Sequence, residues 1–363
     1  MAKLGEVCLL KAGKFVSAND ISPEYNKGLY PCFGGNGIRG YVADYTHDGE
    51  FPLIGRQGAL CGNVNLASGK FHATEHAVVV QPKIEMNVHW LYYALNAMNL
   101  GQYATGAAQP GLAVSKLETL SIEIPNISEQ NKIAQTLYKV EQLVNFRKQQ
   151  LAKLDELVKA RFVEMFGELH KTEYNIKTLD ELFEFIKDGT HQTPTYVDVT
   201  EGYKFLSSKD VTSGYIDWSS IKYISEELHQ ELYKRIAPQR GDILLAKNGT
   251  TGIPAIVETD ETFDIYVSLA LLRLKPNNNV RYIWSALRMP ETKAQFDNSL
   301  KGVGVPNLHL GEIKKTKIIV PPFSLQNQFS AFVERVDQQK QTVQQSLEKL
   351  ELMKKALMQE YFG

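Results

Sequence analysis

The chain of 363 residues contains an internal repeat, and this repeat limits its possible folds more than any other feature. Residues 124–167 align without gaps on residues 320–363 at an offset of 196, with 15 of the 44 paired positions identical. The same offset also pairs Gly106 with Gly302, Pro110 with Pro306, Leu112 with Leu308 and Ile122 with Ile318. A repeat of this kind indicates a duplicated structural unit. We therefore interpret the chain as two units, 1–167 and 168–363.

The repeated tails have the apolar spacing of long helices. Apolar residues recur at steps of three and four, at Ile133, Leu137, Val140, Val144, Leu151, Leu154 and Val158, and again at Phe329, Val333, Val336, Val343, Leu347, Leu350 and Leu357. Ser128 and Ser324 follow a proline and are N-cap candidates, and Gly167 and Gly363 stand where a helix would end. At 1.5 Å per residue each helix would be about 58 Å long.

This apolar seam predicts that the two helices pair with each other as a coiled coil. Because each helix begins where its own globular part ends, we expect an antiparallel pair and a chain that returns on itself, with Gly363 near Met1. Three cations interrupt the seam, namely Arg147, Lys340 and Lys354. They either fix the register of the helices or face a partner protein, and we select them as candidate partner-binding residues.

The globular parts, 1–125 and 168–321, combine short strand-like runs with short aromatic helices. The strand-like runs lie at 76–80, 242–246, 266–274 and 317–320, and the helical segments at 89–95 and 282–287. The expected fold class is α+β, with mixed α/β domains of mostly antiparallel strands.

Each half carries two glycine-containing loops with polar side chains. They are residues 34–40 and 54–58 in the first half, and 188–194 and 246–252 in the second. Glycine allows tight turns, while Arg, Lys, Asn, Gln and Thr side chains can reach base edges and phosphates. Any one such loop is more often only a turn of the chain.

Together these segments resemble the specificity subunits of type I restriction-modification systems. The matching stretches are YPCFGGNGIRGYV at 30–42, IGRQGALCGNV at 54–64, LAVSKLETLSIEIPNISEQNKI at 112–133, DGTHQTP at 188–194, KNGTTG at 247–252 and NLHLGEIKKTKIIVPPFSLQNQF at 307–329. The resemblance covers essentially the whole chain, and its most specific part is the twice-repeated proline, Ser-x-Gln-Asn and long helix.

The resemblance implies a non-catalytic DNA-binding subunit. It implies target recognition domains at 1–125 and 168–321 and helical spacers at 126–167 and 322–363, which bind two methyltransferase (M) subunits and, in the full complex, restriction (R) subunits. S-adenosylmethionine would belong to the methyltransferase partner, ATP and Mg to the restriction partner, and no cofactor to this chain. Two recognition domains held apart by rigid helices suit DNA half-sites about 34 Å apart. Because the two domains differ in sequence, the half-sites should differ too, which implies an asymmetric, interrupted target.

Candidate contacts to double-stranded DNA come from the polar loops. They are Gly35, Asn36, Arg39, Arg56, Gln57 and Gln109 for one half-site, and Lys187, Thr190, His191, Lys209, Lys247, Asn248 and Asn307 for the other. For each residue a structural or phosphate-positioning role is about as plausible as base reading. An adenine beside each half-site would be flipped out and methylated by the partners.

Charge does not indicate a nucleic-acid binder. The net charge is −1, and residues 1–125 carry 9 basic against 10 acidic residues while 168–321 carry 19 against 21. Since neutralisation of DNA phosphates supplies much of the affinity of DNA-binding proteins, we expect the methyltransferase partners to provide many of the contacts to phosphate.

Enzymatic motifs are weak in this sequence. It has no GxxxxGK[ST] phosphate loop, and the VPPF sequence at 320–323 lacks the Asn or Asp of a methyltransferase motif, so we interpret it as a turn. His72 and His76 lack an evident third metal ligand, so no metal site is expected. Two alternatives stay open: a fragment of a fused restriction-methyltransferase, or an adaptor whose two modules bind ligands other than DNA.

The sequence also lacks signs of export. No stretch of about 18 apolar residues occurs, so we expect no membrane span, no signal peptide and a cytoplasmic protein. Cys8, Cys32 and Cys61 fit neither a disulfide framework nor a zinc site and are expected to be reduced thiols.

Overall fold

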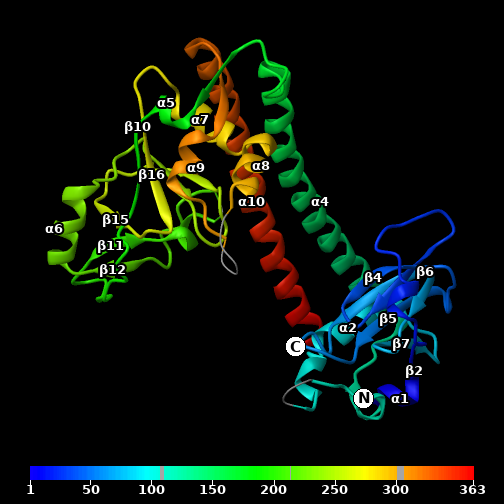
Figure 1. Ribbon diagram of the computed structural model, residues 1–363. Coiled ribbons are helices and arrows are strands. Elements are labelled where there is room, and N and C mark those ends of the chain that lie inside the picture. Colours follow the sequence, from blue (N-terminus) through cyan, green and yellow to red (C-terminus); the bar gives the residue numbers. More distant parts are fainter. Residues whose placement is uncertain (107–109, 213, 301–305) are drawn as a thin grey trace. The chain divides into compact units, whose positions relative to one another are not determined.

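The computed structural model describes residues 1–106, 110–212, 214–300 and 306–363. They form two compact units, one of Met1–Gln149 with Val343–Gly363 and one of Gln150–Thr342. Each unit thus contains a globular part and a section of both long helices (Figure 1). The tail of the chain belongs to the first unit, which confirms the expected return of the chain.

The first unit is built on one mixed sheet with the strand order β2-β7-β5-β6-β3-β4. Its strands are β2 (Cys8–Ala12), β3 (Tyr30–Gly34), β4 (Gly37–Val42), β5 (His47–Gly55), β6 (Val64–Ala73) and β7 (Ala77–Pro82). All its pairings are antiparallel except β3 with β6. A small ladder joins β1 (Ala2–Lys3) to β8 (Ser121–Ile122). The prediction of mostly antiparallel strands is confirmed.

Short helices cover the sheet of the first unit. They are α1 (Leu4–Val7), α2 (Val88–Ala97) and α3 (Val114–Glu118), with 3-10 turns η1 (Ala18–Asp20) and η2 (Leu100–Tyr103). Helix α2 starts at Asn87, whose Oδ1 accepts a hydrogen bond from the Trp90 amide at 2.9 Å. Trp90 is almost fully buried, and its ring lies 6.4 Å from that of Phe362 at the end of the chain.

The second unit contains three small β-sheets. They are β10-β16-β13-β14, β12-β11-β15 and β17-β9. The strands are β9 (Asn175–Thr178), β10 (Phe183–Asp188), β11 (Tyr203–Leu206), β12 (Lys222–Ile224), β13 (Ile243–Ala246), β14 (Pro254–Ile256), β15 (Phe263–Ile265), β16 (Leu269–Leu274) and β17 (Lys317–Val320). Only β11 and β15 pair in parallel within these sheets.

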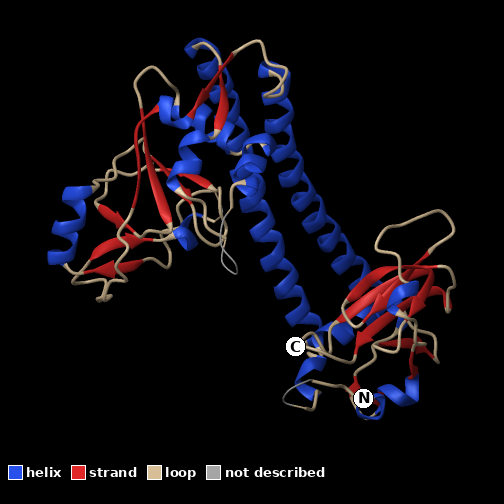
Figure 2. Cartoon of the chain, in the orientation of Figure 1, coloured by secondary structure: helices blue, strands red, loops and turns tan. Residues whose placement is uncertain are grey.

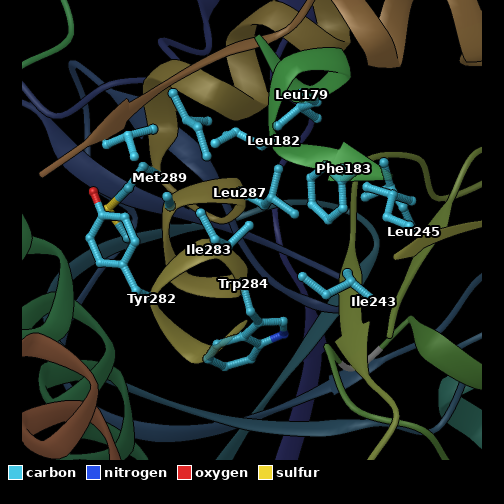
Figure 3. Close-up of a cluster of buried hydrophobic side chains, with 14 of the residues drawn as sticks. Leu179, Leu182, Phe183, Ile243, Leu245, Tyr282, Ile283, Trp284, Leu287 and Met289 are labelled. Atoms are coloured by element: carbon cyan, nitrogen blue, oxygen red, sulfur yellow. The ribbon is translucent and has the colours of Figure 1, made fainter. Parts of the chain in front are cut away.

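The helices of the second unit pack an aromatic core, part of which Figure 3 shows. They are α5 (Leu179–Leu182), α6 (Glu226–Arg235), α7 (Val280–Leu287), α8 (Pro290–Asn298) and α9 (Leu310–Lys315), with the 3-10 turn η3 (Ser208–Val211). Helix α7 contributes the buried Tyr282 and Trp284, whose polar atoms donate to Ile319 O at 2.8 Å and Pro254 O at 2.9 Å. These bonds offset the cost of burying a hydroxyl and an indole N–H.

The two units have the same strand connectivity, and in both of them strands and short helices are combined (Figure 2). Strands β2, β7, β5 and the first part of β6 correspond to β10, β16, β13 and β14, while β4, β3 and the end of β6 correspond to β12, β11 and β15. The second unit therefore divides one long strand into two. The duplication read from the tails extends through the globular parts, where the sequences have diverged.

Each repeated tail forms one uninterrupted helix, α4 (Ile127–Phe166) and α10 (Phe323–Phe362). The prediction of Ser128 and Ser324 as N-caps is wrong, because the helices begin at Ile127 and Phe323 and both serines lie inside them. Asn126 occupies the cap of α4, where its Oδ1 accepts from the Glu129 amide at 3.0 Å. Gly167 has φ +76 after α4, as expected of a C-terminal glycine.

The seam residues face the opposite helix within each unit. In the first unit Leu137 and Val144 of α4 and Leu347 of α10 are buried, and in the second Phe162 of α4 stacks edge-on with Phe329 of α10. Contacts run with rising numbers on α4 and falling numbers on α10. The helices are antiparallel in both units, as predicted.

No helix in the described ranges is long and apolar enough to cross a membrane. All three cysteines are buried free thiols, as the sequence suggested.

Candidate nucleic-acid interface

In the first unit, three polar loops converge on the turn between β6 and β7. The Thr74 amide donates to Phe33 O at 2.9 Å, the Lys14 amide to Ala73 O at 2.9 Å, and the Arg56 amide to His76 O at 3.0 Å. The turn at 74–76 thus holds the loops after β2, β3 and β5 together. We call this set the first loop cluster.

Close backbone contact explains the glycines of this cluster. A Cβ on Gly55 would lie 1.9 Å from Gly35 O, and one on Gly13 would lie 2.0 Å from Ala73 O. Neither position accepts a side chain without moving the backbone. Glycine therefore brings the loops together rather than only turning the chain.

The predicted contact residues of the first half lie on or beside this cluster. Asn36 is exposed and accepts from Asn63 Nδ2 at 2.8 Å, and Arg39 is exposed on β4. Gln57 is exposed, and its backbone pairs with Gly111. Gln109 lies outside the described residues.

Arg56 is held more tightly than its neighbours. Its carbonyl accepts from the Leu112 amide at 2.9 Å, and its Nε is buried with no hydrogen-bond partner in the described part of the chain. Arg56 therefore combines a fixed backbone with unused hydrogen-bonding capacity.

The second unit has an equivalent loop cluster around the turn at 266–268. The Thr190 amide donates to Ile265 O at 3.1 Å, the Tyr266 amide to Leu206 O at 2.8 Å, and the Lys247 amide to Ser268 O at 2.9 Å. These three bonds match those of the first cluster one by one. We call this set the second loop cluster.

Arg56 and Lys247 occupy the same backbone position in the two clusters. Leu308 donates to Lys247 O at 2.8 Å, as Leu112 donates to Arg56 O. The next glycines are also equivalent, since Gly58 donates to Pro110 O at 3.0 Å and Gly249 to Pro306 O at 3.2 Å. The sequence pairs Pro110 with Pro306 and Leu112 with Leu308, and this geometry confirms both.

Not all the glycine-containing loops of the two units correspond in space. The loop at 188–194 does not correspond to 34–40, because Gly189 matches Gly13: their amides donate to Leu269 O at 3.3 Å and to Ala77 O at 3.0 Å. The 34–36 turn corresponds instead to residues after β11. The two loops share a polar, glycine-containing composition, but their backbone bonds place them at different positions in the two units.

The candidate residues of the second half differ widely in exposure. Lys187 and His191 are exposed, with the Lys187 ammonium 5.0 Å from the centre of the Phe185 ring, and Lys209 is exposed in η3. Thr190 is buried, with 7% of its surface exposed, so its side chain is placed to support the loop.

Lys247, Asn248 and Asn307 form the inner part of the second cluster. Lys247 is 6% exposed and pairs with Asp188 at 3.3 Å. Asn248 and Asn307 are bridged through their backbones, and the Oδ1 atoms of both are buried without hydrogen bonds among the described residues. Buried acceptors without a hydrogen bond are uncommon in folded proteins.

Asp188 and Arg235 are not among the residues predicted from the sequence to contact DNA. Arg235, on α6, donates through Nη2 to Asp188 O at 2.9 Å and to Gly189 O at 2.6 Å. The DGTHQTP motif indicated the importance of the segment, but nothing in the sequence placed α6 beside it.

The three cations of the helical seam bond across the helix pair. Arg147 Nε donates to Ser346 Oγ at 3.1 Å, Lys340 pairs with Asp155 at 2.6 Å, and Lys354 pairs with Glu141 at 2.6 Å. These contacts fit the register-fixing alternative, since each cation meets a residue of the opposite helix.

The chain thus consists of two α+β units with equivalent loop clusters and paired long helices. The chain belongs to the family described as type I restriction modification DNA specificity domain, whose model matches residues 1–156 and 171–352. This match covers both units.

Individual relatives agree with this assignment. The chain is 53% identical over 143 residues to the type I restriction enzyme EcoprrI specificity subunit of Escherichia coli, covering 39% of this chain and 36% of that protein. It is 25% identical over 322 residues to a putative type I restriction enzyme specificity subunit of Haemophilus influenzae, covering 85% of this chain and 80% of that protein. The chain thus matches about a third of the length of the first relative.

Solved structures share the fold. The crystal structure of a type I restriction-modification system S subunit from M. genitalium has a TM-score of 0.60 at 18% identity, covering 99% of this chain and 95% of that one. A chain from a study of assembly and conformational transition of the type I R-M system has a TM-score of 0.59 at 14% identity, covering 99% and 96%.

Proposed function

We propose that this chain is the DNA recognition subunit of a type I restriction-modification complex, without catalytic activity of its own. Each unit reads one half of a split, asymmetric target. The observation that supports this most is the equivalent position of Arg56 and Lys247 in two loop clusters with matching backbone bonds. A shared frame with different side chains is suited to reading two different half-sites.

The neighbouring side chains differ between the clusters in the way that base reading requires. Arg or Lys contacts guanine acceptors, whereas Asn and Gln suit adenine. The first cluster offers Arg56 and Gln57, and the second offers Lys247 and Asn248. Different donors on one frame predict different base preferences in the two half-sites.

Within this proposal the recognition domains span 1–125 and 168–321, and the helical spacers 126–167 and 322–363. The contact residues proposed for the first half-site are Gly35, Asn36, Arg39, Arg56, Gln57 and Gln109. Those for the second are Lys187, Thr190, His191, Lys209, Lys247, Asn248 and Asn307. Gly35 acts through its backbone, since its carbonyl oxygen lies 1.9 Å from where a Cβ on Gly55 would stand.

The helices are the proposed docking surface for two methyltransferase subunits. Leu143 and Phe146 of α4 and Leu352 and Met353 of α10 are exposed at 45, 58, 67 and 52%. Apolar exposure on a helix pair that already has a buried seam suits a protein interface. The exposed sides of Arg147, Lys340 and Lys354 would border it.

The partners would supply the chemistry and much of the grip on DNA. S-adenosylmethionine belongs to the methyltransferase subunits, and ATP and Mg to the restriction subunits, all within the cytoplasm. Because neither recognition domain is basic, this chain alone should bind DNA weakly.

Methylation mapping tests the proposal. The chain is co-expressed with the methyltransferase subunit encoded beside it, and genomic adenine methylation is mapped. The expected result is methylation in a split target with two different halves. Arg56→Ala should relax only one half and Lys247→Ala only the other, each by about 1–3 kcal/mol per base contact.

Two results would contradict the proposal. One is methylation of a continuous palindrome. The other is the same target and the same salt dependence of binding for wild type, Arg56→Ala and Lys247→Ala.

A further inference from the structure

The carboxylate of Asp188 lies at the centre of the second loop cluster. Its Oδ2 is 3.3 Å from Lys247 Nζ and 3.2 Å from His191 Nε2. Its side chain is 17% exposed, between the buried Lys247 and the largely exposed His191. The carboxylate therefore retains access to solvent from one side.

The backbone around Asp188 is fixed from several directions. Arg235 holds the carbonyls of Asp188 and Gly189, and the Gly189 amide donates to Leu269 O at 3.3 Å. A Cβ on Gly189 would meet Ile265 O at 2.0 Å, so the chain packs directly against β15. Because the backbone is held in this way, the carboxylate of Asp188 starts from a fixed position in the loop cluster.

The acceptor capacity of Asp188 is only partly used. A carboxylate has about four lone-pair sites on two oxygens, and both contacts are made by Oδ2. Within the described part of the chain Oδ1 accepts no hydrogen bond. An acceptor therefore remains beside the residues proposed to contact DNA.

A carboxylate on a DNA-facing surface is repelled by phosphate, so it needs a specific donor to be favourable. In the major groove, Asp and Glu accept from the exocyclic amino group of cytosine. The ammonium of Lys247, 3.3 Å from Asp188 Oδ2, offsets part of this repulsion.

The first loop cluster has no carboxylate at this position. Ala12 precedes Gly13 and pairs with Val78, as Asp188 precedes Gly189 and pairs with Ala270. Asp188 thus distinguishes the second cluster from the first on an otherwise matching frame.

We propose that Asp188 determines sequence specificity by accepting a hydrogen bond from the N4 amino group of a cytosine in the half-site read by residues 168–321. The proposal rests on the proposed function. It assigns Lys247 a second role, which is to orient this acceptor.

The test uses the complex of the full chain with its methyltransferase subunits and duplexes of the mapped target. Each cytosine of the second half-site is replaced in turn by N4-methylcytosine, which keeps base pairing but replaces the amino hydrogen facing the major groove. Dissociation constants are measured by fluorescence anisotropy for wild type, Asp188→Ala, Asp188→Asn and the control Asp180→Asn. Asp180 lies in α5, before the opposite end of β10.

Replacement of one particular cytosine by N4-methylcytosine should lower the affinity of wild type and of Asp180→Asn about tenfold. A loss of this size is expected when one base contact is removed. Asp188→Ala should lose less than about twofold there, because it has no acceptor to lose. Asp188→Asn should also bind unrelated duplex more tightly, because a negative charge has been removed.

Equal losses for wild type and Asp188→Ala at every cytosine would overturn the assignment, as would a second half-site without any required cytosine. Unchanged reading of the first half-site by the variants shows that they are folded. Absence of any split target in the wild-type complex would instead overturn the proposed function.

Discussion

Two buried glutamines account for the most specific part of the repeated sequence. Gln130 donates to Pro125 O at 2.8 Å and accepts from the Asn87 amide at 2.9 Å. Gln326 makes the same pair of bonds, to Pro321 O and from the Asn279 amide, at 2.9 Å each. Ser-x-Gln-Asn is therefore a junction motif that joins the long helix to the cap of α2 or α7.

Replacing Gln326 with alanine should lower the free energy of unfolding by about 2–6 kcal/mol. It leaves the Pro321 carbonyl and the Asn279 amide without their hydrogen-bond partner, at about 1–3 kcal/mol each. Urea unfolding followed by circular dichroism measures the change.

Gln328→Ala is the matched control, because Gln328 is exposed two residues further along the same helix. It should change stability by less than about 0.5 kcal/mol. Equal effects of the two substitutions would contradict the junction role.

A second residue-level prediction concerns Asp264. Its Oδ2 lies 2.6 Å from His229 Nδ1, and burial raises the pKa of Asp264 to about 6 although the histidine acts in the opposite direction. Because the folded pKa exceeds the unfolded value, the folded state binds the proton more tightly, and this group costs stability as pH rises from about 4 to above 6.

Asp264→Asn keeps the shape of the side chain but cannot ionise. The stability of the variant relative to wild type should rise by up to about 3 kcal/mol between pH 4 and pH 6.5. Urea unfolding across this pH range measures the difference. A difference that stays constant would show that folding leaves the pKa of Asp264 unchanged, and one that falls would show that the folded state stabilises the carboxylate; either result contradicts the prediction.

At the level of elements, the long helices were predictable and their starting residues were not. Apolar residues at steps of three and four determine which face of a helix is buried. The apolar seam from Ile133 to Val158 could therefore be predicted from the sequence. The cap depends on which side chain reaches a free amide, and Asn126 does so in place of Ser128. Local sequence offered both residues.

The seam cations provide an element-level prediction. Lys354 and Glu141 pair across the helices with 33 and 24% exposed side chains. A double-mutant cycle with Lys354→Ala and Glu141→Ala should give a coupling energy of about 0.5–1 kcal/mol.

The pair formed by Lys159 and Glu156 on one helix is the control, since it is more exposed and joins neighbouring turns. Its coupling should not exceed about 0.5 kcal/mol. A coupling near zero for Lys354 and Glu141 would leave the register to the apolar seam alone.

At the level of the whole molecule, the repeat predicted the return of the chain but not the convergence of its loops. The polar loops were visible as glycine-containing segments. Their grouping depends on backbone bonds to turns 74–76 and 266–268, which the sequence does not mark. Asp188 remained unselected for the same reason, since its neighbours Lys247 and Arg235 are distant in sequence.

The return of the chain makes a prediction about distant substitutions. Phe362 packs near Trp90 in the first unit, and the equivalent Phe166 is buried beside Tyr282 in the second. Phe362→Ala should increase amide hydrogen exchange within 1–125, and Phe166→Ala within 168–321.

Hydrogen exchange with mass spectrometry measures both variants, and each serves as the control of the other. Phe166→Ala should destabilise the protein by about 3–5 kcal/mol. This is more than expected for Phe362→Ala, because the side chain of Phe166 is only 1% exposed. Faster exchange spread evenly over both units would contradict independent cores.

The glutamine junction has an evolutionary consequence. Its glutamine side chains bond to the cap of a short helix and to a proline carbonyl, and among the described residues these bonds involve none of the loops proposed to contact DNA. A recognition domain that keeps an asparagine cap and a closing proline could replace another without altering the helices. Exchange of whole domains would then create new targets in one event, whereas substitution at loop positions would adjust them base by base.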